Sequence, residues 1–187
     1  MSPFLLSFFL LAGLRPPTAT PAAHPSGSLA TATPVDFWRE LPTTQARRLG
    51  KARLTPTRYR VFALDLAGLR RTLAPATADS GPDLLLPLPD GSRQLYHLRA
   101  STTMAPELAA RYPTLRTYAG QSATAPADYV RLEVTSTGLH ALLVRAGRTL
   151  LIEPYRAGDT QHYICFDKAA LPAGSKPAFE IPGGPQR

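Results

Sequence analysis

The sequence has a single cysteine and only isolated histidines, although these residue types most often build disulfides, metal sites and nucleophilic sites. Cys165 is the only cysteine among the 187 residues, so no disulfide can form within the chain. None of the four histidines is spaced from another histidine, a glutamate or a cysteine as zinc ligands are; they are His24, His97, His140 and His162. The sequence therefore predicts neither a metal site nor a cofactor.

Patterns that mark other enzyme classes are also missing. The HExxH pattern of zinc proteases, the glycine-rich loop that binds phosphate and the nucleophile elbow do not occur. The 13 acidic residues are dispersed, and Asp65, Asp90 and Glu107 stand where a helix cap, a turn and a helix start are expected. Paired-carboxylate chemistry has no support, and we expect that the chain is not an enzyme.

The basic charge of the chain is not accompanied by a nucleic-acid recognition motif. The formal net charge is +8, but the lysines and arginines are scattered, and only Arg47, Arg48, Lys51 and Arg53 form a local cluster. A solvated basic surface explains this pattern, and we expect no nucleic-acid partner.

Long hydrophobic runs are absent except at the N-terminus. Residues 4–14 (FLLSFFLLAGL) have the length of a signal-peptide core and are too short to span a bilayer as a helix. Small residues follow, so we expect a signal peptide over residues 1–22 that is cleaved between Ala19 and Ala23, or later at the A-x-A of residues 30–32. The mature protein would then be secreted or in the cell envelope, without a membrane span.

The 20 prolines gather at both ends of the chain and at turns, which marks linkers around a folded centre. Residues 23–34 have the composition of a disordered linker, and residues 169–187 have that of a proline- and glycine-rich interdomain linker. We expect one domain over residues 35–168.

Hydrophobic periodicity predicts about seven short strands between residues 59 and 166, with two short helices between them. Residues 84–88 and 93–99 form a hairpin around Asp90-Gly91, and apolar and polar residues alternate from Tyr129 to Thr135. The helices are expected at residues 66–73 and 105–112. The fold class is therefore α+β, with a predominantly antiparallel β-sheet.

Cys165 is the one residue whose chemistry could act on a partner. A thiolate can occupy the open coordination position of a catalytic zinc and exclude the water that the metal activates. Cys165 would then be an inhibitory thiol toward a zinc ion that a second protein holds. The alternative is a buried cysteine that packs as a small hydrophobe between Ile164 and Phe166.

Four blocks of sequence resemble a known family in the same order. They are LPLPDGS (86–92), MAPELAARYPTLRTYAGQS (104–122), RLEVTSTGLHALL (131–143) and IEPYRAGDTQHYI (152–164). From Tyr59 to Lys168 the chain is similar to the N-terminal propeptide region of bacterial reprolysin-like secreted zinc metalloproteases, which are metzincins. The catalytic domain with its HExxHxxGxxH site is not in this chain, and Cys165 does not lie in the cysteine-switch motif of animal relatives.

The resemblance implies a non-catalytic module that assists the folding of a metalloprotease catalytic domain or keeps it latent. That domain would be the partner, either in trans or in cis within a longer parent protein. The alternative is a secreted β-rich binding module whose basic surface contacts anionic polymers of the cell envelope.

Overall fold

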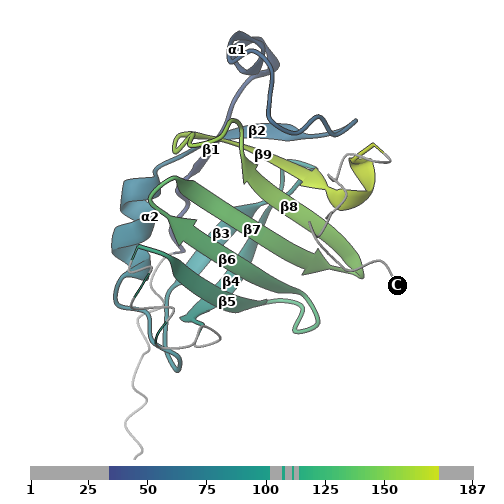
Figure 1. Ribbon diagram of the computed structural model, residues 1–187. Helices are drawn as coiled ribbons and strands as arrows, with labels where there is room; N and C mark the ends of the chain where they lie inside the picture. Colours follow the sequence, from purple (N-terminus) through teal and green to yellow (C-terminus); the bar gives the residue numbers. More distant parts are fainter. Residues whose placement is uncertain (1–33, 102–106, 108–110, 112–113, 173–187) are drawn as a thin grey trace, which may run out of the picture. The chain divides into compact units, whose positions relative to one another are not determined.

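Figure 1 shows a computed structural model of the protein. The residues that it describes are 34–101, 107, 111 and 114–172. They belong to one compact unit that spans residues 33–187. The expected signal peptide, nearly all of the first linker and most of the helix expected at residues 105–112 lie outside the described residues.

The described residues form nine strands, two α-helices and one 3-10 helix. The strands are β1 (Trp38–Glu40), β2 (Arg60–Leu64), β3 (Asp83–Pro87), β4 (Arg93–Ala100), β5 (Arg116–Ser122), β6 (Tyr129–Thr135), β7 (Gly138–Arg145), β8 (Arg148–Pro154) and β9 (His162–Asp167). The helices are α1 (Thr43–Arg48), α2 (Leu66–Leu73) and the 3-10 helix η1 (Lys168–Ala170).

The described strands form one antiparallel sheet in the order β1-β2-β9-β8-β7-β6-β5-β4-β3. Its two edges approach each other, because Val35 makes a single parallel bridge to Leu84 of β3. The sheet therefore curls into a nearly closed barrel (Figure 1). The predominantly antiparallel sheet is confirmed, and the fold is mainly β.

The helices agree only in part with the sequence prediction. α2 has the predicted bounds, because the Asp65 carboxylate accepts a hydrogen bond from the Gly68 amide at 2.9 Å and caps its first turn. Leu66, Leu69 and Leu73 bury one face of α2 on the barrel core. α1 was not predicted, since its six residues, TTQARR, show no apolar period.

The interior of the barrel is the main core. Alternate residues of the strands point into it, and Phe62, Tyr96 and Tyr163 are its largest fully buried side chains. Burial raises the pKa of Tyr96 and Tyr163 to about 12. Trp38 packs edge-on against Phe62 and Tyr163, with ring centroids 6.4 and 5.5 Å apart, so the lone tryptophan anchors β1 to the core.

Arg93 closes the seam between the first and the last strand of the sheet. Its guanidinium donates to the Asp36 carboxylate at 3.2 Å and to the Trp38 carbonyl at 3.4 Å. Its Cζ also lies 4.8 Å from the centroid of the Phe62 ring, a cation–π distance. One side chain of β4 thereby holds the segment that leads into β1.

A second, smaller core lies outside the barrel, on the outer face of β2 and β9. The segment 41–54, which includes α1, covers this face, and Leu171 after η1 packs at its border. The buried members of this core are Leu41, Ala52, Val61, Tyr155, Ile164 and Phe166. We call the outer face of β2 and β9 the covered face. η1 and Leu171 continue the described chain just past residue 168, where the domain was expected to end.

Candidate functional site

Cys165, the residue that the sequence analysis singled out, lies inside the barrel on β9. Its side chain is 0% exposed, and its thiol donates to the Pro87 carbonyl at 3.3 Å. Burial raises the pKa of the thiol well above its usual value, since the interior disfavours the charged thiolate. This placement favours the buried-hydrophobe interpretation. The thiol-switch hypothesis stays a prediction, and it now requires β9 to leave the sheet.

Each histidine of the described residues contacts one carboxylate through its ring nitrogen Nδ1. His97 contacts Asp83 at 2.7 Å, and His162 contacts Asp159 at 3.3 Å. His140 contacts Glu153 at 2.8 Å. Within the described part of the chain, no group of three or more His, Cys, Asp or Glu side chains could hold a metal ion. His24 lies outside that part.

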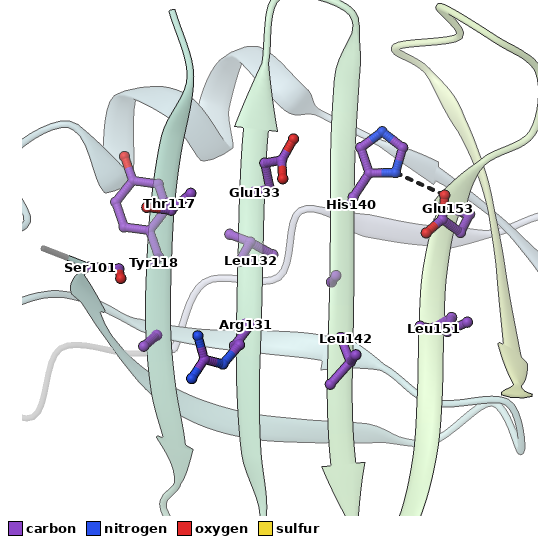
Figure 2. A pocket seen from close by; sticks show the side chains of 12 residues that line it. Ser101, Thr117, Tyr118, Arg131, Leu132, Glu133, His140, Leu142, Leu151 and Glu153 are labelled. Atoms are coloured by element: carbon purple, nitrogen blue, oxygen red, sulfur yellow. Dashed lines mark hydrogen bonds and ion pairs between the residues drawn. The ribbon is translucent and has the colours of Figure 1, made fainter. Parts of the chain in front are cut away.

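The outer face of β5, β6, β7 and β8, which we call the open face, carries three rows of side chains. The strand register gives the rows as Thr117, Glu133, His140 and Glu153; then Ala119, Arg131, Leu142 and Leu151; then Gln121, Tyr129, Val144 and Thr149. Figure 2 shows most of the first two rows lying side by side on neighbouring strands. The first row is polar and charged, whereas the other two mix apolar with polar groups.

The open face is hollowed and partly apolar. A shallow hollow of about 510 Å³ lies over the first two rows (Figure 2). Of the large hydrophobic side chains in the described residues, four are exposed, and two of these four are on this face: Tyr129 at 42% and Leu142 at 36%. An apolar surface with a charged border is typical of a protein-binding site.

A chain of charges crosses the edge of the open face. Oε2 of Glu153 accepts a hydrogen bond from Arg53 Nη2 at 2.8 Å and lies 2.8 Å from His140 Nδ1. The hydrogen bond with Glu153 raises the pKa of His140, and the negative charge of Glu133 adds to this effect. Arg53 belongs to the segment over the covered face, so this chain of charges links the two faces.

The hollow is built by the sequence blocks that carry the family resemblance. Ten of its twelve lining residues lie in the blocks 104–122, 131–143 and 152–164; the two others are Ser101 and Leu151. Strand alternation can predict which side chains share a face, but no local pattern pairs His140 with Glu153. That pair joins β7 to β8 and depends on the register of the two strands.

A second hollow, of about 630 Å³, lies between α1 and the start of β2. Arg47, Arg58 and Arg60 line it together with the buried apolar residues Leu41 and Val61. We call it the cationic groove. Arg47 belongs to the basic cluster recognised in the sequence, whereas Arg58 just before β2 and Arg60 in β2 reach the groove through a tertiary contact that no local pattern shows.

No protein-family model, curated protein or solved structure matches this chain. No helix among the described residues is long and apolar enough to cross a membrane.

Proposed function

We propose that this protein is a non-catalytic, propeptide-like module that binds the catalytic domain of a secreted zinc metalloprotease. Its binding would assist the folding of that domain or keep it latent. The proposal rests on which stretches of sequence form the open face. The sequence blocks that resemble metalloprotease propeptides supply most of the lining of its hollow.

The open face would act by docking flat against the protease domain. Leu142 and Tyr129 offer apolar contact area, and the pair of His140 and Glu153 borders it with a fixed charged group. Strand addition at a sheet edge is less suited to this fold. The edge strand β1 has only three residues, and Val35, just before it in the chain, already forms a bridge to β3.

The site of action would be outside the cytoplasm. The predicted signal peptide exports the chain, and the protease partner is of a secreted family, so both would meet in the envelope or outside the cell.

The test is a titration of the purified protein against the catalytic domain of a reprolysin-like metalloprotease from the same genome, with peptide cleavage as the readout. We expect saturable inhibition by the wild type. Leu142→Arg should weaken it by at least about tenfold, because a charge would replace an exposed apolar side chain near the middle of the open face. The control is Ala67→Arg, which adds the same charge at an exposed position of α2.

Absence of both inhibition and binding would refute the proposed function. Equal loss of inhibition in Leu142→Arg and Ala67→Arg would instead move the binding site away from the open face. Refolding of the denatured catalytic domain with and without this protein separates a folding role from a purely inhibitory one.

A further inference from the structure

The segment that builds most of the cationic groove is rich in basic side chains. Residues 39–60 carry seven basic side chains and one acidic side chain, Glu40. Glu40 pairs with Arg60, and Arg53 pairs with Glu153. No acidic side chain of the described residues forms an ion pair with Arg47 or Arg58. The groove therefore presents guanidinium groups that its own surroundings do not neutralise.

The groove is held in shape by contacts from the far end of the chain. The Tyr155 hydroxyl donates to the Gly50 carbonyl at 2.6 Å, and the Arg53 amide donates to the Tyr155 carbonyl at 2.8 Å. The Arg156 side chain also donates to the Leu49 carbonyl. These contacts fix the walls of the groove, so ligand binding would cost less conformational entropy here than on a flexible surface.

The lining of the groove combines two kinds of chemistry. Arginine forks suit carboxylates, and arginine and tyrosine are the residues that most often dominate protein interfaces. Tyr59 lines the groove and is 43% exposed. Ala46, which is half-buried, adds apolar surface to the groove beside the buried Leu41 and Val61. A wholly polar polyanion would leave this apolar surface unused, whereas a polypeptide segment with acidic and apolar side chains would use both.

We infer that the cationic groove binds an acidic, partly apolar polypeptide segment of a partner protein. Arg47 and Arg58 pair with its carboxylates, while its apolar side chains contact Tyr59 and Ala46. The inference goes beyond the proposed function, since the groove shares no lining residue with the hollow of the open face.

The test uses short fluorescein-labelled peptides and the full protein, with fluorescence anisotropy as the readout. In the main probe, glutamate alternates with leucine; in the comparison probe, glutamate alternates with serine at the same charge. We expect the leucine probe to bind at least about fivefold more tightly than the serine probe. The double variant Arg47→Ser/Arg58→Ser should lose roughly tenfold or more of that affinity.

The matched control is Arg116→Ser, which removes the same kind of charge at an exposed position on β5. We expect it to bind the leucine probe as the wild type does, and thermal melting should show that all variants fold.

An equal loss in Arg116→Ser would mean that net charge alone attracts the probe and would overturn the inference. Tighter binding of dextran sulfate than of the leucine probe, or equal binding of both peptides, would also overturn it. Protease inhibition is not measured in this experiment, so its failure is distinguishable from that of the proposed function.

Discussion

The two outer faces of the barrel differ in what covers them. On the covered face, Ile164 and Phe166 point outward from β9 and are fully buried under the segment that contains α1. On the open face, Tyr129 and Leu142 point outward from β6 and β7 and remain exposed among charged neighbours. Both are outer faces of the same sheet, and the strands of both faces point apolar side chains into the barrel core.

One part of the sheet is therefore packed under a second core, whereas the outward side chains of the other part remain exposed. β9 is apolar on both faces because it lies between two cores, as its sequence HYICFD reflects. β6 alternates strictly, YVRLEVT, because only one of its faces has a core to pack on. Packing on the covered face stabilises the fold, whereas the outward side chains of the open face have no second core to pack on.

The largest expected contrast is between truncations on the two faces. Phe166→Ala should lower the free energy of unfolding by about 3–5 kcal/mol, because it opens a cavity in the second core. Leu142→Ala should change it by less than about 0.5 kcal/mol, since that side chain is already exposed. Urea denaturation of both variants measures the contrast. A cost at Leu142 that approaches the cost at Phe166 would show that the open face is buried in solution.

The reactivity of Cys165 provides a second contrast, between the native and the unfolded chain. With both faces of β9 packed, a thiol-specific reagent should modify native Cys165 at least about a hundredfold more slowly than the urea-unfolded chain. Time-resolved absorbance with Ellman's reagent measures both rates. Rapid labelling of the folded protein would mean that β9 opens readily and would restore the thiol-switch hypothesis.

The hydrogen bond from Tyr155 to Gly50 tests how firmly the covering segment is held. Tyr155→Phe should destabilise the protein by about 0.5–1.5 kcal/mol, because the Gly50 carbonyl loses its donor while the ring stays in place. Tyr129→Phe, the same change on the open face, should alter stability by less than about 0.5 kcal/mol. Differential scanning calorimetry can rank the two variants.

The smallest expected effect is the pH dependence that arises from His140. The folded-state pKa of His140 is raised, so its stabilising contribution is complete below the unfolded pKa of about 6.5 and disappears as the pH rises through the folded pKa. His140→Gln should therefore cost up to about 1 kcal/mol at pH near 5.5 and less at pH near 8.5. Urea midpoints at the two pH values give the difference. A larger cost at the higher pH would contradict the assigned pair with Glu153.

The sequence predicted those elements that are specified by residues close together in the chain. Asp90-Gly91 predicted the turn between β3 and β4, where Gly91 has φ +92°. The Asp65 cap and the leucine spacing predicted α2. β1 and α1 were missed because three and six residues are too short to show a period, and both are held by tertiary contacts of Trp38 and Leu41.

The sequence predicted less of the candidate sites, because both depend on which strands become neighbours. His140 and Glu153 are 13 residues apart and meet only through the register of β7 and β8. Arg47 and Arg58 share a groove only because α1 folds back over β2. Cys165, by contrast, attracted attention as a lone cysteine, and the structure gives it a place in the core.

Hydroxyl-radical footprinting of the complex with a reprolysin-like catalytic domain would show whether the open face is the binding surface, since it reports which side chains the partner covers. We expect the oxidation of Tyr129 and Leu142 to fall severalfold when the catalytic domain is added at saturating, inhibiting concentration. Unchanged oxidation of both residues in a complex that is nevertheless inhibited would contradict the claim that the open face is the binding surface.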